Sequence, residues 1–342
     1  MDRIKLCMLA PEFLPIWGGV GAYTVELVKH LPKEVDIHVV TLKRSIAGMS
    51  KKNLVKNDPR YLFNRRVNIH YISNAMETFF YNLGFQIACF RNIRRLHRTY
   101  KFDIMHSHLG HMPDIFLQLL KKNPIPTVST VHNTFRLQKE ITLATGLALS
   151  DLEWAEKSFL AFYPALTLLE QLYVAQANIS KFLAVSNSAR KELIKHLKIK
   201  PEKITVIYNG VDINFFHPPN KNEWEKKFLR PTVVYMGRMI GKKGIHLLIK
   251  AIPTIIRHHP QTRFLFVGSG NIAYYRQMIK KEGVPERNFA FTGHVSYFER
   301  PKTLAKATIF VNPSLYENCS LSILEAMSCG TSVVASNVGG NP

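Results

Sequence analysis

Continuous apolar runs of strand length alternate with helix-period segments along almost the whole chain. Ile4–Ala10 is the first run. After a glycine-rich loop, the apolar residues between Val20 and Leu31 recur at the spacing of one helical stripe, which Pro32 ends. Runs that are apolar at every position suit parallel strands covered on both faces. The alternation therefore predicts an α/β fold built on doubly wound parallel sheets.

A polar stretch divides these runs into two series. Between Asp212 and Arg230 the alternation lapses into a segment that contains proline and lysine, as is typical of a domain boundary. A chain of 342 residues is long enough for two cores. We expect Rossmann-like domains over residues 1–212 and 213–342, facing each other across a cleft, with ligands at the carboxyl ends of the strands. Strands are expected at 4–10, 35–41, 67–72, 102–108, 127–132, 182–186 and 204–208, and then at 232–237, 264–267, 289–292, 309–312 and 332–335.

The chain is strongly basic. Lysine and arginine outnumber the acidic residues by 46 to 24, which gives a net charge of +22. Such a field attracts nucleic acid, anionic membranes or phosphate-bearing substrates. The excess gathers between Lys43 and Arg66 and between Arg91 and Lys101, and solvated surface faces remain an equal alternative. Nucleic acid is the least favoured partner, because no aromatic-interleaved basic motif accompanies the clusters.

Cysteine usage and hydropathy bear on the compartment. The four cysteines are widely spaced, with no CxxC pair and no zinc-ligand spacing, as expected of small buried residues in a reducing environment. The apolar run at the N-terminus is too short for the core of a signal peptide. The longest apolar stretch, Phe159–Leu169, is well under the ~20 residues that span a bilayer. We expect a cytoplasmic protein whose only membrane contact is peripheral.

A glycine-rich turn follows the first expected strand. Trp17, Gly18 and Gly19 lead into the helical stripe at a point where glycine lets the backbone approach a ligand and free helix amides favour an anion. A tight turn would need glycine anyway. The segment also lacks the GxGxxG spacing of a dinucleotide site, and no acidic residue ends the second strand, so a nicotinamide cofactor is disfavoured.

Cations follow the first strand of the second series. Arg238 comes directly after Gly237, and Lys243 lies near the start of the next helix. An arginine fork and a lysine point charge at this edge of a sheet suit one diphosphate. Two solvated surface cations are the open alternative.

Two glutamates bracket a helix start near the C-terminus. Glu317 and Glu325 would lie roughly 12 Å apart if the helix were continuous between them. One carboxylate would then reach a sugar and the other a ribose, with phosphates held by the amides near Ser320. Two glutamates at this spacing are common by chance. Only their position around a helix start supports a role in binding. Leu321, Leu324 and Met327 are expected to face the core.

These motifs, taken in order, resemble one family across nearly the whole chain. The chain is similar to the retaining glycosyltransferases of the GT4-like (group 1) family, which includes bacterial mannosyltransferases and sucrose synthase-like enzymes. The resemblance implies the two-domain GT-B architecture. The matching segments are 11–13, 17–21, 102–108, 130–133, 184–188, 207–212, 235–238, 266–270, 291–294 and 316–330.

The resemblance assigns roles in the first domain, which would be the acceptor side. Gly18 and Gly19 would approach the donor phosphate or the sugar. His132 would be catalytic, contacting the transferred sugar near the reacting centre. A lone histidine is more often a hydrogen-bonded core residue than a catalytic one. Only the matching motif around His132 favours a catalytic role for it. A metal site at His106, His108 and His111 is disfavoured, because no carboxylate or cysteine nearby completes a ligand set.

In the second, nucleotide-sugar-binding domain, the resemblance assigns Arg238 and Lys243 to the diphosphate and the leaving group. Glu317, also catalytic, would bind sugar hydroxyls, and Glu325 the ribose. Fixed cations and amides can stabilise a departing nucleoside diphosphate without a metal, and no DxD motif is present, so we expect no cofactor. The remaining donor-binding residues are Asn318, Cys319, Ser320 and Leu321.

The implied reaction is transfer of a hexose from a nucleotide-sugar, with retention, to a lipid-linked or polysaccharide-precursor acceptor of cell-envelope glycan synthesis. Family members usually continue beyond Pro342 with further helices, so we expect reduced stability and impaired activity for this chain. A truncated remnant or nucleotide-sugar-binding module is therefore an alternative, and a nucleotide-sugar epimerase is a weaker one. The basic first half, including Arg91, Arg94, Arg95 and Arg98, suggests an anionic membrane as a partner.

Overall fold

The computed structural model describes the chain except for residues 1–2, 15–17, 45–61, 64–66, 76–80 and 121–122, and it leaves out the side chains of seven further residues. The described chain folds into two compact units. Unit 1 comprises Met1–Leu137 and Tyr163–Tyr208, and unit 2 comprises Gln138–Phe162 and Asn209–Pro342. Helices α6 (Phe135–Leu143) and α7 (Trp154–Gln176) each run across the division.

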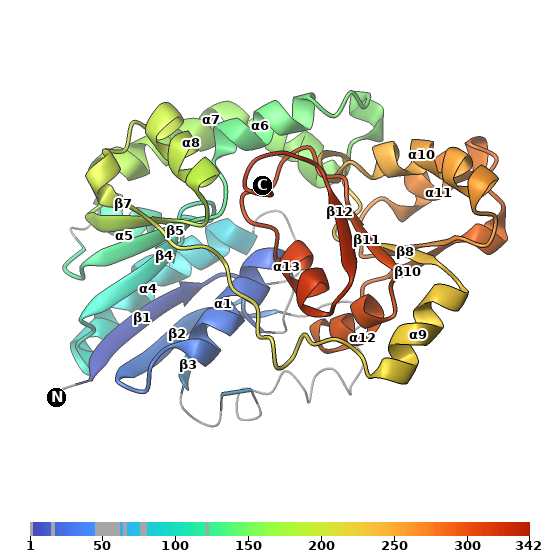
Figure 1. The fold of residues 1–342 in the computed structure, drawn as a ribbon. Helices are drawn as coiled ribbons and strands as arrows, with labels where there is room; N and C mark the ends of the chain where they lie inside the picture. Colours follow the sequence, from blue (N-terminus) through green and yellow to red (C-terminus); the bar gives the residue numbers. More distant parts are fainter. Residues whose placement is uncertain (1–2, 15–17, 45–61, 64–66, 76–80, 121–122) are drawn as a thin grey trace. The chain divides into compact units, whose positions relative to one another are not determined.

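Unit 1 is built on a parallel sheet. Seven strands of its described residues pair in the order β3-β2-β1-β4-β5-β6-β7, as Figure 1 shows. The strand order runs outward from β1 to β3 on one side and from β4 to β7 on the other, so it changes direction between β1 and β4. Every pairing is parallel, so the carboxyl ends of these central strands lie at the same side of the sheet. The strands are β1 (Ile4–Ala10), β2 (Val35–Arg44), β3 (Val67–Ala75), β4 (Ile104–His108), β5 (Thr127–Val131), β6 (Ile179–Ala184) and β7 (Ile204–Val206).

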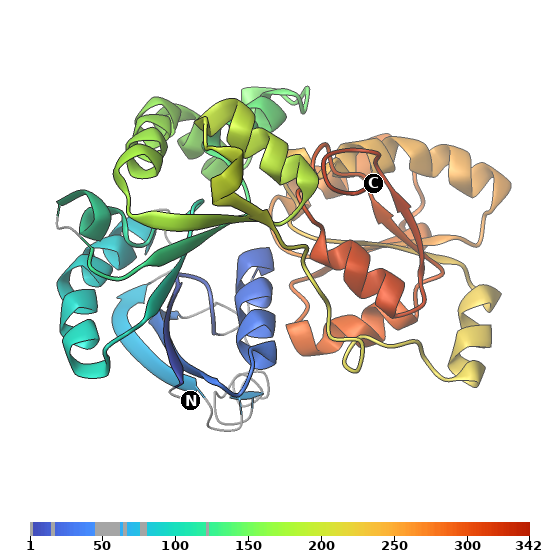
Figure 2. The same ribbon diagram turned by 60° about the vertical axis from the view of Figure 1, so that its left-hand side comes forward.

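Helices cover both faces of this sheet. Helix α1 (Gly18–His30) lies on one face, and α4 (Tyr81–Tyr100) and α5 (Ile115–Leu120) lie on the other (Figure 2). Helix α4 buries Phe85, Cys89 and Ile93 at helical spacing against β1, β2 and β4. Helix α8 (Asn187–Leu197) follows β6 and begins at Ser186, whose Oγ accepts a hydrogen bond from the Ala189 amide at 3.1 Å.

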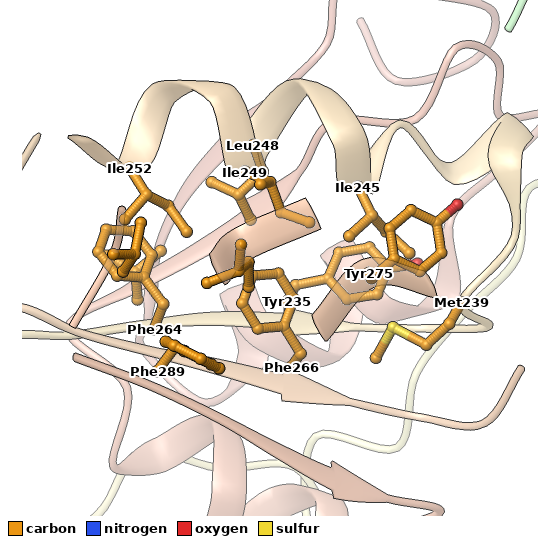
Figure 3. Packing of buried hydrophobic residues seen from close by; sticks show 13 residues of the cluster. Tyr235, Met239, Ile245, Leu248, Ile249, Ile252, Phe264, Phe266, Tyr275 and Phe289 are labelled. Atoms are coloured by element: carbon orange, nitrogen blue, oxygen red, sulfur yellow. The ribbon is translucent and has the colours of Figure 1, made fainter. Parts of the chain in front are cut away.

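Unit 2 carries a smaller parallel sheet. Its five strands pair in the order β10-β9-β8-β11-β12. In Figure 3 the apolar face of α10 packs on β8, β9 and β10, with Tyr235, Phe264 and Phe266 beneath Ile249. The strands are β8 (Thr232–Met236), β9 (Arg263–Val267), β10 (Phe289–Gly293), β11 (Ile309–Asn312) and β12 (Ser332–Ala335), and the helices are α9 (Lys221–Leu229), α10 (Ile245–His258), α11 (Ile272–Lys281), α12 (Arg300–Ala305) and α13 (Leu321–Ser328).

The prediction of an α/β fold with doubly wound parallel sheets is confirmed, and all the expected strands are present. Strand β6 begins three residues earlier than expected, and the polar stretch after Asp212 contains α9. The buried stripe of α1 is also rotated from the expected one, because Gly21, Val25 and Val28 are buried while Val20 and Tyr23 are only partly covered. No helix of the described residues is long and apolar enough to cross a membrane.

One glycine fixes the loop that follows β8. Gly244 has φ +66° and links a single 3-10 turn, Gly241–Lys243, to the start of α10. A Cβ atom at this position would lie 1.9 Å from the Pro313 carbonyl oxygen, which follows β11. The two loops are also joined by a hydrogen bond from the Leu315 amide to the Lys242 carbonyl oxygen at 3.0 Å. Only glycine permits this close backbone approach.

Substitution Gly244→Ala is therefore expected to destabilise unit 2 by more than about 2 kcal/mol, because left-handed backbone strain adds to a direct clash. Gly283→Ala is the matched control, since Gly283 has φ +71° but open space around its Cβ position. It should lower the free energy of unfolding by only about 1 kcal/mol. Urea unfolding followed by circular dichroism measures both, and equal losses would contradict the role given to the Pro313 contact.

Candidate donor-binding and catalytic residues

In unit 1 the predicted glycine turn lies beside a carboxylate. Gly18 opens α1 with φ +67°, and a Cβ atom there would lie 3.1 Å from Glu12 Oε2. Gly19 is exposed, with open space at its Cβ position. Glu12 also reaches the next loop, where its Oε1 lies 3.7 Å from His111 Nε2. The start of α1 therefore offers glycine backbone next to an acidic side chain, while Trp17 of the same motif lies outside the described residues.

Histidines and a tyrosine surround the predicted catalytic residue. His132 follows β5, and its Nε2 lies 3.2 Å from Nδ1 of His108, the last residue of β4. The Tyr23 ring, from α1, packs edge-on against His132 with ring centroids 4.7 Å apart. His106 Nε2 lies 2.7 Å from Thr130 Oγ1, which also lies 3.2 Å from the Tyr23 hydroxyl. The carboxyl ends of β4 and β5 and the first turns of α1 thus converge on one polar cluster.

Burial keeps this cluster neutral. It lowers the pKa of His132 to about 3 and the pKa of His106 to about 4, and the neighbouring His111 and His106 add to the shift of His132. The pKa of His108 is lowered well below its usual range by burial and by the other histidines. At neutral pH these imidazoles therefore act as hydrogen-bonding groups and carry no charge.

The His108–His132 contact favours one tautomer. Two neutral imidazoles share a proton only if one ring nitrogen donates and the other accepts. His108 Nε2 is buried without a hydrogen-bond partner among the described residues. A buried nitrogen lone pair is easier to leave unsatisfied than a buried N–H. The arrangement thus favours donation from His108 Nδ1 to His132 Nε2, which places the proton of His132 on Nδ1.

The histidine cluster should make stability depend on pH. Below pH 6.5 His106 binds a proton in the unfolded chain but stays neutral in the folded chain. The folding free energy that depends on neutral His106 is therefore fully present above pH 6.5 and is lost as the pH falls towards about 4. His106→Asn should flatten this decline by up to about 1.4 kcal/mol per pH unit. Urea unfolding at a series of pH values between 6.5 and 4.5 measures the slope.

A second variant provides a control of opposite sign. Burial raises the pKa of Glu170 to about 7, and its carboxylate oxygens accept from the Phe135 amide at 3.2 and 3.4 Å. The folded chain therefore holds a proton on Glu170 at pH values where the unfolded chain has lost it. The folding free energy from this group is fully present below pH 4.5 and is lost as the pH rises through about 7. Glu170→Gln should therefore make the loss on acidification steeper. Identical slopes in wild type and His106→Asn would show that folding does not shift the pKa of His106, which would contradict its burial as a neutral imidazole.

In unit 2 the structure brings Lys243 and Glu317 together. Lys243 Nζ donates to Glu317 Oε1 at 2.5 Å, and Ser314 Oγ donates to the same oxygen at 2.7 Å. Burial alone would raise the pKa of Glu317, but Lys243 and these hydrogen bonds lower it. The Glu317 carbonyl oxygen accepts from the Gly340 amide at 2.7 Å. The loops after β8 and β11 thus meet at one carboxylate.

Arg238, the other predicted phosphate ligand, pairs elsewhere. Its Nη2 lies 3.1 Å from Glu153 Oε2, and its side chain is 54% exposed. Glu153 immediately precedes α7, and burial raises its pKa while Arg238 acts against that shift. A half-exposed pair of this kind is weak, so it competes poorly with a phosphate for the guanidinium.

Glu325 points into the core of unit 2. It is 2% exposed, and its Oε1 accepts from Arg300 Nη1 of α12 at 3.2 Å. Helix α13 begins only at Leu321, so Glu317 and Glu325 do not share a continuous helix. The expectation that Met327 faces the core is wrong, because Met327 is 61% exposed and Ala326 is buried in its place. Glu325 therefore faces inward and pairs with Arg300.

The segment between the two glutamates, which was predicted to bind the donor, leads into α13. Ser320 is the residue before the helix, and its Oγ accepts from Asn312 Nδ2 at 3.2 Å. The Cys319 carbonyl oxygen accepts from Asn209 Nδ2 at 2.9 Å, so the first residue of the second segment of unit 2 holds this turn. Asn318 and Leu321 are partly buried.

Sequence reasoning missed several partners of these residues. Tyr23 and Arg300 contact predicted site residues from elements remote in sequence, and no local spacing signals them. Glu12 lies six residues before Gly18 in the matching segment 11–13, but the sequence analysis gave it no role. Lys242 adjoins Lys243, and burial with its cationic neighbours lowers its pKa to about 8. Its signal was the lysine pair itself, which lies in the 3-10 turn between β8 and α10. Within the described residues, His106, His108 and His111 do not form a group of three ligand atoms close enough to share an ion.

Most of the first basic cluster, including Lys51, Lys52, Lys56, Arg60, Arg65 and Arg66, lies outside the described residues. The second cluster lies on α4, where Arg91, Arg95 and Arg98 are exposed on one face.

Two protein-family models match this chain. "Glycosyltransferase Family 4" matches residues 17–215, which is more than half of the chain, and "Glycosyl transferases group 1" matches residues 230–342. The chain belongs to this glycosyltransferase family. The resemblance drawn from the motifs is therefore confirmed.

Among curated relatives of this family, the gpi3 subunit of phosphatidylinositol N-acetylglucosaminyltransferase from Schizosaccharomyces pombe is 23% identical over 317 residues. The match covers 91% of this chain, and the chain spans 64% of that relative's length.

Solved glycosyltransferases share the fold. Sucrose-phosphate synthase from Thermosynechococcus elongatus aligns over 99% of this chain and 82% of its own, with a TM-score of 0.72 and 18% identity. Anabaena HepE in complex with UDP-glucose aligns over the same shares, with a TM-score of 0.67 and 19% identity. The two parallel-sheet units therefore match the GT-B architecture.

Proposed function

We propose that this protein transfers a hexose from a nucleotide-sugar to an acceptor, with retention and without a metal. The observation that carries the proposal lies in unit 2, where the loops after β8 and β11 bring Lys243 to Glu317 beside the turn that opens α13. A cation, a carboxylate and a helix start at the carboxyl edge of a parallel sheet suit a nucleoside diphosphate bound to a sugar. HepE, of the same fold, is described in complex with UDP-glucose.

The proposed roles follow from the charge that develops on the leaving group. Departure of a nucleoside diphosphate builds negative charge, which Lys243 and Arg238 would stabilise as fixed cations. The lowered pKa of Glu317 keeps its carboxylate ionised, so that it accepts hydrogen bonds from sugar hydroxyls. Glu325 would bind the ribose hydroxyls, for which it would exchange part of its contact with Arg300.

For unit 1 we propose that His132 contacts the transferred sugar. Its low pKa suits hydrogen bonding to a neutral hydroxyl and makes it a poor store of positive charge. Gly18 and Gly19 would admit the donor phosphate or the sugar close to the backbone.

The proposed acceptor is lipid-linked or a polysaccharide precursor, at the surface of an anionic membrane. The name of the fission-yeast relative specifies phosphatidylinositol as that enzyme's acceptor. The charge of +22 supports an anionic partner for this chain.

A nucleotide-sugar-binding module without transfer activity is the second candidate. Each charged residue proposed to bind the donor in unit 2 is already in an ion pair, since Arg238 pairs with Glu153, Lys243 with Glu317, and Glu325 with Arg300. Such pairs stabilise a binding site whether or not chemistry follows. Release of free nucleoside diphosphate from a bound nucleotide-sugar would separate the enzyme from the module.

A thermal-shift titration with UDP, GDP, ADP and their hexose conjugates tests the donor site. Ligand that binds only the folded state raises stability by about 2.7 kcal/mol at one hundred times its dissociation constant. We expect a rise in Tm with one base, and its loss in Lys243→Ala. Arg263→Ala is the matched control, because Arg263 is an exposed cation at the opposite, amino end of β9. A cooperative melt unmoved by every nucleotide, or lost equally in both variants, would contradict the proposal.

A further inference from the structure

Unit 1 contains a pocket that the donor site does not use. It has a volume of about 480 Å³, within the usual range for ligand pockets. It lies between the carboxyl ends of α7 and α8, the start of β6 and the 3-10 turn Pro201–Lys203. His108 and His132 follow the carboxyl ends of β4 and β5, whereas this pocket lies at the amino end of β6 and β7, the opposite edge of the same sheet.

The walls of the pocket are apolar and its remaining lining is mainly cationic. Helix α7 contributes Val174 and Ala175, the strand β6 contributes Ile179 and Phe182, and the segment after α8 contributes Ile199. The cationic residues that line it are Lys198, Lys200 and Lys203, all exposed at the surface. His196 also lines it and is paired with Glu192 at 2.9 Å.

An exposed leucine stripe on α7 runs up to this pocket. Leu168, Leu169 and Leu172 are 56%, 39% and 36% exposed, and they share one helix face. Between Ser158 and Gln176 the only Asp, Glu, Lys or Arg is Glu170, which is fully buried. Helices α7 and α8 lie side by side in both views of unit 1 (Figures 1 and 2). An uncharged, leucine-rich surface therefore borders a pocket with a basic lining.

The charge of the neighbouring helix extends the basic side. Helix α8 exposes Lys191 and Lys195 one turn apart, and Lys198 continues the same line past its end. Glu202 is the acidic residue between Lys200 and Lys203, so the local balance remains positive. The combination of an apolar cavity, lysines around it and an exposed leucine stripe matches one class of ligand, an acyl chain that carries an anionic head group.

We propose that this pocket and stripe form a docking site for an anionic membrane lipid. One acyl chain enters the apolar cavity, the lipid phosphate binds Lys198, Lys200 and Lys203, and Leu168 and Leu172 insert among neighbouring chains. The arginine face of α4 (Arg91, Arg95 and Arg98) offers charge but does not line this pocket. This inference concerns attachment to a membrane and does not rest on the transferase proposal.

Lipid monomers test the pocket directly. Calorimetric titration of the purified chain with lysophosphatidylglycerol, below its micelle concentration, should show binding, while glycerol phosphate should show none and lysophosphatidylcholine should bind more weakly. Ala175→Asp places a charge in the apolar wall at an exposed helix position, so the fold is retained and binding should fall at least tenfold. Unchanged lysophosphatidylglycerol binding in this variant would overturn the pocket assignment.

Vesicles test the surface. Co-sedimentation with phosphatidylcholine vesicles containing phosphatidylglycerol should fall on the order of one hundredfold at low salt when Lys198, Lys200 and Lys203 are changed to Gln, since each cation near such a surface is worth roughly fivefold. The triple variant of Arg91, Arg95 and Arg98 to Gln carries the same charge change and should lose less than tenfold. The reverse order of effects would place the contact on α4 and overturn the proposal.

A second copy of the chain is an alternative occupant of the stripe. Leu168→Ser with Leu172→Ser should weaken vesicle binding while the protein stays monomeric by light scattering. If the wild type is a dimer that these changes dissociate, with vesicle binding intact, the stripe is an interface between copies and the lipid proposal fails.

Discussion

The close backbone approach between Gly244 and Pro313 is the constraint on which the candidate donor site of unit 2 depends. It joins the loop after β8 to the loop after β11, with room for no side chain between them. That junction sets Lys243 next to Glu317, and the 2.5 Å contact between them lowers the pKa of a carboxylate that burial alone would raise. Because neighbouring parallel strands end at the same edge, one tight glycine turn is enough to bring opposite charges together.

Unit 1 also carries its polar residues at the carboxyl ends of parallel strands, but there they are buried and uncharged. Burial is the largest cause that lowers the pKa values of His106, His108 and His132, and it keeps all three side chains neutral. The hydrogen bond between His108 and His132 then depends on tautomers, with no charge involved. A neutral imidazole suits recognition of hydroxyl groups, and the cations that suit phosphate lie in unit 2.

Much of the candidate site was predictable, because ligands of parallel α/β sheets bind at the carboxyl ends of the strands. Arg238 and Lys243 were identified from their position after a buried strand, and Glu317 from its position before a helix. The partners were not predictable in this way. Glu153 reaches Arg238 from 85 positions away and Arg300 reaches Glu325 from 25 away, and neither spacing has a local signature. The predicted inward face of α13 was wrong in the same region, since Glu325 is buried with Arg300 as its partner and Met327 is exposed.

The sequence by itself determined the architecture and the family. Unbroken apolar runs require strands covered on both faces, and a strand such as Ile309–Asn312 follows from its own residues. Only the tertiary structure decided which charges meet, which histidines stay neutral, and that α7 exposes Leu168 beside a pocket with a basic lining. The physical reason is that strand and helix formation depend on local spacing. Pairing and burial instead depend on residues that the fold brings together from distant parts of the chain.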